Sequence, residues 1–232
     1  MVDIHSHMLP GIDDGPDDIN ESVEMARMAL HEGITAVVCT PHAIRDFDQL
    51  LALAEERLQA LKGELARRQV PLALYQGFEV YASESLLDYQ DIKRLTLPGG
   101  KRMLLEFDFG SMPACADEVL YLLRISNITP VLAHLERFDY MNRDIGRMKA
   151  LKQQGAMIQV NTGSITGMHG RAAQKCAKKM IKAGLVDYIA TDAHSTRRRG
   201  PYVAAAAGLI SKWASGECFD GLMSNAEDIV NI

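Results

Sequence analysis

The chain has 232 residues, of which 47% are hydrophobic and 24% charged, as expected for a globular protein with a sizeable core. A net charge of −5 gives no electrostatic basis for nucleic-acid binding, and no apolar run approaches the roughly 20 residues that span a bilayer. We therefore expect no nucleic-acid partner and no membrane insertion. Four widely spaced cysteines and an N-terminus without a signal-peptide pattern predict a cytoplasmic protein with reduced thiols.

Short apolar runs alternate along the chain with longer amphipathic segments. Strands are expected at residues 2–5, 34–40, 72–79, 102–107, 129–134, 156–161 and 187–192. Helices are expected at residues 17–32, 46–68, 115–127, 143–154 and 170–183, with one more after Pro201. No linker or repeat interrupts this alternation, which predicts a single α/β domain over residues 1–232. A parallel barrel and a doubly wound sheet both satisfy the pattern.

Polar side chains at the ends of the predicted strands favour the barrel. They lie at or just past the last residue of successive strands: His5, His42, Glu79, Glu106, His134, Asn161 and Asp192. In a barrel, the carboxyl ends of all strands meet at one mouth, where active sites are found. In an open sheet, the first and seventh strands can lie far apart, so their polar residues would not meet.

The same residues have the chemistry of a metal cluster. His5 and His7 are separated by one residue, which places both imidazoles on one face of an extended segment. Glu79 and Glu106 lie in apolar surroundings, where a carboxylate is costly unless it is paired or binds a metal. Each motif alone also has a structural explanation, but five of the seven histidines belong to the set. Together they predict an enzyme with bound divalent transition metals.

Four stretches of the chain resemble the PHP (polymerase and histidinol phosphatase) superfamily, and most closely its bacterial tyrosine-phosphatase branch. They are DIHSHMLPGIDDG at residues 3–15, TPH at 40–42, HLERF at 134–138 and TDAH at 191–194. Small departures are Leu135, Phe138 and Ser195, where the branch usually has proline, tyrosine and asparagine. The resemblance implies a distorted seven-stranded parallel (β/α)7 barrel that holds three divalent metals, with manganese expected and iron, zinc or magnesium as alternatives.

The resemblance also implies which residues bind each metal. The first metal would be held by His5, His7, Glu79 and Asp192. Glu79 would bridge to a second metal held also by Glu106 and His134, and the third would be held by Asp14, His42 and His194. A carboxylate bridge is chemically reasonable because it relieves the repulsion between neighbouring cations.

Two arginines are expected to bind the substrate phosphate. Arg137 follows His134 by three residues, and Arg199 follows His194 by five, so both are expected at the mouth. A guanidinium group binds phosphate oxygens in a bidentate manner. Arg197 and Arg198 are alternatives to Arg199, or belong to a solvated loop.

One motif is interpreted as accidental. Cys39 and Arg45 match the Cys-x5-Arg pattern of cysteine-dependent phosphatases, but no glycine lies between them and Pro41 removes a backbone amide. That chemistry needs a loop of amides that cradles the phosphate and lowers the pKa of the thiol.

We therefore predict a cytoplasmic, metal-dependent protein-tyrosine phosphatase in which a hydroxide bridging the metals attacks phosphotyrosine. The family resemblance implies that its substrate is the tyrosine-rich tail of a bacterial tyrosine autokinase, and that its role lies in capsule or exopolysaccharide synthesis. One alternative is a small-molecule phosphomonoesterase such as histidinol-phosphate phosphatase. Another is a regulatory PHP module without catalytic activity.

Overall fold

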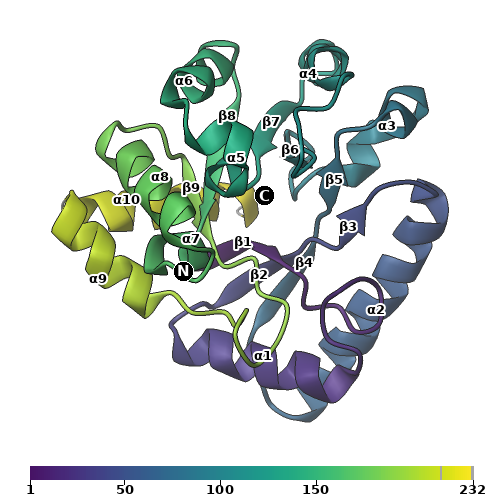
Figure 1. The fold of residues 1–232 in the computed structure, drawn as a ribbon. Coiled ribbons are helices and arrows are strands. Elements are labelled where there is room, and N and C mark those ends of the chain that lie inside the picture. Colours follow the sequence, from purple (N-terminus) through teal and green to yellow (C-terminus); the bar gives the residue numbers. More distant parts are fainter. Residues whose placement is uncertain (215, 231–232) are drawn as a thin grey trace.

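The computed structural model describes residues 1–214 and 216–230, with the strands at the centre and the helices around them (Figure 1). All strand pairings are parallel, in the orders β1-β2-β4 and β3-β5-β6-β7-β8-β9. The strands of the described residues are β1 (Val2–Ser6), β2 (Ala36–Cys39), β3 (His42–Ala43), β4 (Ala73–Gln76), β5 (Glu79–Tyr81), β6 (Arg102–Glu106), β7 (Thr129–Leu132), β8 (Met157–Asn161) and β9 (Tyr188–Ala190).

Seven longer helices cover the strands in the described part of the chain. They are α1 (Ile19–His31), α2 (Phe47–Arg67), α4 (Ala116–Ile125), α6 (Ile145–Gln153), α8 (Arg171–Lys182), α9 (Ala204–Trp213) and α10 (Gly216–Val230). Shorter elements lie near the strand ends: α3 (Glu84–Asp88), α5 (Asp139–Asn142), α7 (Thr162–Thr166) and the 3₁₀ helices η1 (Ile92–Leu95) and η2 (Leu135–Arg137). None of the helices described here has the length and apolarity needed to cross a bilayer.

The predicted helices agree with the structure, apart from the short ones and the last. One helix was expected after Pro201, whereas α9 and α10 both follow it. The short helices were not predicted because one turn is too short to show a helical period. Helix α1 begins as its sequence indicates: Asp18 accepts hydrogen bonds from the amides of Asn20 and Glu21. It is followed by Gly33, whose φ of 86° favours glycine.

The parallel α/β class is confirmed, but a seven-stranded barrel is not. The described residues form nine strands in two sheets, because two of the predicted strand paths are interrupted. The predicted strand 72–79 breaks at Gly77, which separates β4 from β5. The path that starts with β2 is likewise broken at Pro41 before β3 begins. Backbone hydrogen bonds from Gly77 to Cys39 and from Glu79 to Pro41 continue across the break, so the strands follow one curled surface.

The first and last strands meet. The amide of Asp192 donates to the carbonyl oxygen of His5 at 2.9 Å, and the amide of His7 donates to that of Ala193 at 2.8 Å. These hydrogen bonds join the end of β1 to the segment after β9. Segments that are nearly 190 residues apart in the sequence therefore lie side by side, with Ser6 paired to Ala193 in parallel.

Side chains alternate between two cores. The smaller core takes alternate residues such as Ala36 and Val38 of β2 and Tyr188 and Ala190 of β9, and it also contacts α10. The larger core lies between the strands and the outer helices and contains Val37 and Cys39. This alternation follows from the two-residue repeat of a strand.

A bulge in β1 breaks this alternation next to the site. Asp3 pairs with Val37 and Ser6 with Cys39, so one extra residue of β1 lies opposite β2. As a result Ile4 packs in the smaller core, and the following residue, His5, points to the polar cluster described below. Bulges commonly redirect a side chain in this way beside active sites.

We predict that Gly15→Ala destabilises the protein by about 1–3 kcal/mol. A Cβ atom at Gly15 would lie 2.1 Å from the carbonyl oxygen of His7, a backbone atom, so the loop after β1 would have to move. Urea denaturation measures the free energy of unfolding.

Gly63→Ala is the matched control. Gly63 lies on the exposed side of α2, and a Cβ atom there meets no atom within 4 Å. Alanine favours the helix, so this change should stabilise the protein by about 0.5–1 kcal/mol. Equal stability of Gly15→Ala and the unsubstituted protein would show that the loop accommodates the methyl group.

Candidate metal centre

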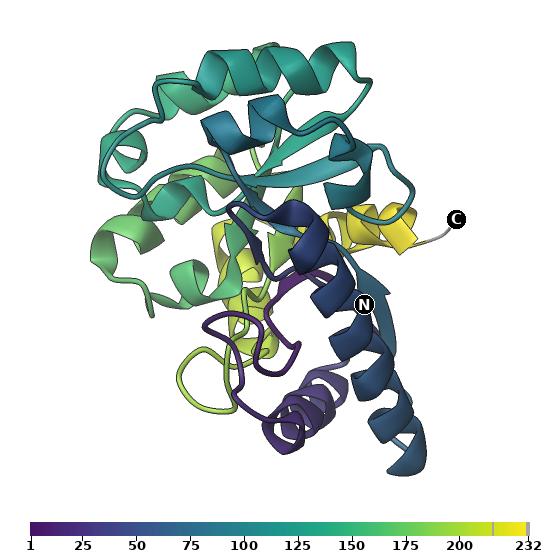
Figure 2. The ribbon, with the colours of Figure 1, turned by 90° about the vertical axis from the view of Figure 1, so that its right-hand side faces the viewer.

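The carboxyl ends of the strands bring all nine predicted metal ligands together. The loops after β1 and β9 complete the group, and both project from the same end of the molecule (Figure 2). Each ligand lies in hydrogen-bond or ion-pair contact with at least one other. The nine residues are His5, His7, Asp14, His42, Glu79, Glu106, His134, Asp192 and His194.

Glu79 lies at the centre of the cluster. Its Oε2 atom is 3.2 Å from Nε2 of His5 and 3.1 Å from Nε2 of His7. Its other oxygen, Oε1, is 2.9 Å from Nε2 of His134, which is in turn 3.5 Å from Oε1 of Glu106. Oδ1 of Asp192 is 3.5 Å from Nε2 of His5. One carboxylate thus faces two groups of ligands, as a bridging ligand does.

A third group forms around Asp14, in the loop after β1. Its Oδ1 atom is 3.1 Å from Nε2 of His194 and 3.4 Å from Nε2 of His42. The His7 ring stacks on the His194 ring with a centroid separation of 3.9 Å. The nearest potential ligand atoms of His7, Asp14, His42 and His194 all lie within 4.8 Å of one another.

The donor atoms of this cluster fit divalent cations. Oε2 of Glu79 and Nε2 of His194 are buried without a hydrogen-bond partner, although polar atoms surround both. Two ring nitrogens, Nε2 of His5 and of His7, approach to 3.2 Å. An ion with ligands at about 2.1 Å separates those ligands by roughly 3.0–3.4 Å, close to the separations seen here. Imidazole and carboxylate ligands suit zinc, manganese and iron.

Two of the predicted ligand residues have an unusual backbone. His134 has a φ of 34° and Asp192 a φ of 52°, in the left-handed region that non-glycine residues rarely adopt. Such residues cost about 1–3 kcal/mol each and are concentrated at functional sites. Both residues lie two positions past the end of a buried strand, β7 or β9, so the turn directs each side chain into the cluster.

A chain of buried amides supports the ligands from behind. Nδ1 of His5 is 3.1 Å from Oε1 of Gln159, whose Nε2 donates to Oδ1 of Asn161 at 2.8 Å. Nδ2 of Asn161 donates in turn to Oδ2 of Asp192 at 2.6 Å. Nδ1 of His7 is similarly held by Asp13, at 2.7 Å from Oδ2. Neither Gln159 nor Asp13 was predicted to have a role. For Gln159 a usable signal exists, because Gln159 and Asn161 are polar residues at alternate positions of an apolar strand.

The close packing of charges shifts the pKa values of the cluster. Burial alone would lower the pKa of His5 and His7, but nearby carboxylates, Glu79 among them, outweigh burial and raise it. Burial would raise the pKa of Glu79, but the surrounding histidines hold it well below its usual value. Burial and the negative charge of Glu79 raise the pKa of Glu106 to about 8. The site therefore concentrates negative charge that bound cations would neutralise.

Arg137 and Arg199 both reach the cluster, as predicted. Nη1 of Arg137 donates to Oδ2 of Asp192 at 2.9 Å, and its guanidinium lies over the Phe109 ring, 4.9 Å from the centroid. Nη2 of Arg199 donates to Oδ1 of Asp192 at 3.2 Å, and Nη1 donates to Oδ2 of Asp14 at 3.3 Å. Among the three consecutive arginines, Arg199 is the one that contacts the cluster in the described structure.

A cavity of about 300 Å³ lies above the cluster. Six predicted ligands and both arginines line it, together with Ile44, Tyr81 and Phe109. Ile44 and Phe109 are large apolar side chains with 52% and 48% exposure, so they can contact a ligand. These three residues were not predicted, because the local sequence does not indicate which side chains at strand ends and in loops meet at a cavity. Tyr81 is the last residue of β5, and Ile44 and Phe109 lie after the ends of β3 and β6.

Cys39 takes no part in the cavity. It is fully buried in the core between the strands and the helices, and burial raises the pKa of its thiol to about 12. Arg45 lies apart, with a side chain that is 81% exposed. The interpretation of the Cys-x5-Arg match as accidental is confirmed.

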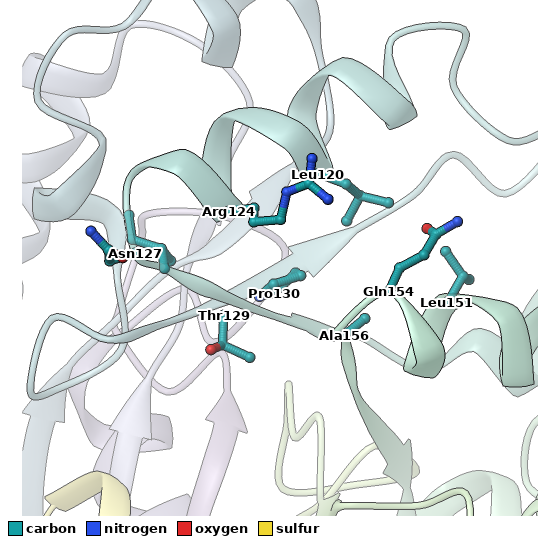
Figure 3. Close-up of a pocket in the computed structure, with 10 residues that line it drawn as sticks. Leu120, Arg124, Asn127, Thr129, Pro130, Leu151, Gln154 and Ala156 are labelled. Carbon is teal, nitrogen blue, oxygen red and sulfur yellow. The ribbon is translucent and has the colours of Figure 1, made fainter.

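Another cavity, of about 410 Å³, lies between α4 and α6 beside the first residues of β7 (Figure 3). Thr129 and Pro130 line it, so it belongs to the amino ends of the strands, opposite the cluster. Arg124 is its charged residue, and no histidine or carboxylate is among its described lining. This composition does not suit a metal or phosphate reaction site.

The fold and the cluster together define a parallel α/β protein with a site for divalent metals. Residues 1–231 match the family model described as "Capsular polysaccharide synthesis, CpsB/CapC". The chain therefore belongs to the CpsB/CapC family, in agreement with the resemblance found in its motifs.

Two named relatives and one solved structure are similar to the chain over most of its length. The chain is 31% identical to "Tyrosine-protein phosphatase YwqE" of Bacillus subtilis, over 98% of this chain and 90% of that protein. It is 31% identical to "Putative tyrosine-protein phosphatase CapC" of Staphylococcus aureus, over 86% and 79%. A crystal structure of "unique metal-dependent tyrosine phosphatases", YwqE and CpsB, superimposes with a TM-score of 0.90 at 30% identity, over 99% of this chain and 94% of that chain. Dihydropyrimidinase from Brevibacillus agri shares the fold alone, with a TM-score of 0.56 at 11% identity.

We predict that Gln159→Leu weakens metal binding by about 10- to 100-fold, because groups that orient a metal-binding histidine contribute this much. Gln159 is fully buried, and leucine preserves its approximate volume while removing the acceptor for His5. Elemental analysis after dialysis against graded chelator measures the affinity. His31→Ala, on α1 and outside the cluster, is the control and should bind metal normally. Normal affinity in Gln159→Leu would mean that His5 needs no support from β8.

Proposed function

We propose that this chain is a metal-dependent protein-tyrosine phosphatase that acts in capsular or exopolysaccharide synthesis. The observation that carries the proposal is the cavity itself. Its lining combines clustered imidazole and carboxylate groups with Arg137 and Arg199, and with the exposed apolar side chains of Ile44 and Phe109. The family and the names of its relatives support the same activity. Because all nine ligands converge, a regulatory module without catalytic activity is disfavoured.

The proposed metal content is three divalent ions, manganese first, with iron, zinc or magnesium as alternatives. His5, His7, Glu79 and Asp192 would hold one ion, and Glu79, Glu106 and His134 a second. Asp14, His42 and His194 would hold the third, which agrees with their mutual proximity. When bound, such ions neutralise phosphate charge and lower the pKa of water, which makes it a nucleophile near neutral pH.

The two arginines would orient the phosphate and stabilise charge on its oxygens in the transition state. Both are anchored on Asp192, which fixes the guanidinium groups at the cavity wall before the substrate binds. The Phe109 face under Arg137 adds a cation–π contact that limits its motion. Groups held in advance in this way need little reorganisation during the reaction.

The leaving group also favours tyrosine. Tyr81 lines the cavity, but burial and the hydrogen bond that its hydroxyl donates to Asp108 raise its pKa to about 12. Tyr81 is therefore a poor proton donor. A phenol has a pKa near 10, so a phenolate can leave as an anion without being protonated. The alkoxide of serine would need a proton donor. The exposed ring of Phe109 offers an apolar surface to a tyrosyl ring.

The proposed substrate is a phosphotyrosyl protein, and by family resemblance the tyrosine-rich tail of a bacterial tyrosine autokinase. A cytoplasmic location is proposed with it. The support is that the thiols of Cys39, Cys115 and Cys176 form no disulfide, which suits a reducing compartment.

Matched peptides that differ only in the phosphorylated residue test this function. We expect kcat/KM with manganese to be at least about 100-fold higher for phosphotyrosine than for phosphoserine, because the phenolate leaves without a proton donor. Free histidinol phosphate serves as the competing small substrate. Equal rates on the two peptides, or faster turnover of histidinol phosphate, would favour a general phosphomonoesterase.

Two substitutions separate the metal mechanism from a thiol mechanism. Cys39→Ser should retain most activity, and thiol alkylation should leave the enzyme active, because Cys39 is buried away from the cavity. His5→Ala should abolish activity together with metal binding. A folded, metal-loaded Cys39→Ser protein without activity would contradict the proposed mechanism.

Arg137→Ala should keep the metals and lose about 100-fold or more in kcat, the usual cost of removing a donor that stabilises transition-state charge. Metal content and steady-state kinetics on a phosphotyrosyl peptide are measured on the same preparation. Arg57→Ala, on α2, is the control for loss of a surface guanidinium. Loss of metal in Arg137→Ala would instead indicate that Arg137 positions Asp192 for metal binding.

A further inference from the structure

A second cleft adjoins the metal cavity and has no assigned role. Its volume is about 610 Å³, and Phe109, Arg137 and Arg199 belong to the walls of both. The remaining lining residues come from the α7–α8 connection and the loop after β9: Met168, His169, Gly170 and Arg198. A peptide whose phosphotyrosine occupies the metal cavity would reach this cleft directly across the shared wall.

The charge of this cleft is opposite to that of the metal cavity. Asp14, Glu79, Glu106 and Asp192 line the metal cavity, whereas three arginines and no carboxylate line the cleft in the described structure. Burial and the charge of Arg137 lower the pKa of His169 to about 4, so this histidine is neutral at pH 7. The positive charge of the cleft therefore comes from the guanidinium groups.

Arg198 supplies the part of this charge that the protein does not neutralise. Arg137 and Arg199 both form ion pairs with Asp192. Arg198 is exposed, and its Nη2 donates to the backbone carbonyl oxygen of Met168 at 3.0 Å. It forms no ion pair with a carboxylate of residues 1–214 or 216–230. A guanidinium tethered at the edge of a cleft without an anionic partner is suited to an anion on a ligand.

The first turn of α8 reinforces this preference. Gly170 precedes α8 and lines the cleft, no side chain caps the helix, and its first turn contains no acidic residue. The positive end of the helix dipole is therefore left without a negative group from the protein. Met168 and Phe109 add apolar surface between the charged groups, as a peptide-binding cleft requires.

We propose that this cleft is a substrate-recognition subsite, in which Arg198 binds an anionic side chain that flanks the phosphotyrosine of the substrate. The inference rests on the proposed phosphatase function and adds a sequence preference to it. The anion is a carboxylate or a second phosphate monoester, which share the same charge and geometry toward a guanidinium. Arg198 is thus a specificity-determining residue that acts outside the reaction centre.

The test uses neutral phosphotyrosyl peptides into which one glutamate is placed at each of three positions on either side of phosphotyrosine. A parallel series carries phosphoserine at the same positions, and tyrosine absorbance reports cleavage of the phosphotyrosyl ester alone. At low ionic strength, the best glutamate peptide should exceed the neutral peptide about fivefold in kcat/KM, mainly through KM, and 0.5 M salt should remove most of this advantage. A larger effect in the phosphoserine series would identify phosphate as the preferred anion.

Arg198→Gln should reduce kcat/KM on the glutamate peptide to its value on the neutral peptide. Arg197→Gln is the matched control, because Arg197 lies one residue away but lines a different hollow beside Glu21 and Glu24. Its preference for the glutamate peptide should match that of the unsubstituted enzyme. Arg198→Glu paired with a lysine peptide should recover part of the lost preference.

Equal kcat/KM for neutral and anionic peptides with the unsubstituted enzyme would overturn this inference while leaving the phosphatase function intact. No hydrolysis of any phosphotyrosyl peptide would instead overturn the function itself. 4-Nitrophenyl phosphate is too small to reach the cleft. If Arg198→Gln lost as much kcat/KM on this substrate as on the glutamate peptide, the inference would also be overturned, because Arg198 would then act at the reacting phosphate.

Discussion

The repulsion between carboxylates gathered at one end of the strands is the constraint on which this structure depends. Glu79, Glu106 and Asp192 are buried together, and burial alone would favour their neutral forms. Histidines around Glu79 and the two arginines on Asp192 offset part of this cost. Divalent cations would offset the remainder, so the site is built for a ligand that the chain does not supply. A buried cluster of this kind is weak evidence for stability and stronger evidence for function.

The scaffold holds this unfavourable arrangement through backbone features that would otherwise be defects. A bulge in β1 turns His5 into the cluster, and left-handed turns at His134 and Asp192 do the same for two further ligands. Buried amides of Gln159 and Asn161 then connect His5 to Asp192. Because these contacts join β1, β8 and the segment after β9, the geometry of the metal site and the joining of the first and last strands depend on each other.

The fold is shared more widely than the chemistry. Dihydropyrimidinase and D-hydantoinase share the fold with this chain at TM-scores of 0.56 and 0.57, but at 11% and 9% identity the likeness concerns the fold alone. The side chains that line the two hollows come in part from the loops after the strands, which carry Phe109, Arg137 and the arginines after β9, and function is set by such sites and not by the fold. In this chain those loops form two adjoining hollows of opposite charge, one suited to metals and phosphate and the other to an anion on the substrate.

The sequence by itself determined the parallel α/β class, most helix positions and the convergence of the polar residues at the strand ends, because apolar periods are local and the carboxyl ends of parallel strands meet. The full set of nine potential ligands, Asp14 and His194 included, came from the resemblance of its motifs to a known family. It also excluded Cys39, since a residue that ends a buried run without nearby glycines has no phosphate loop. The tertiary structure alone decided the breaks at Pro41 and Gly77, the support from Gln159, and the different positions of Arg197, Arg198 and Arg199. These features depend on contacts between residues far apart in the chain, and on the paths of loops that local periodicity does not specify.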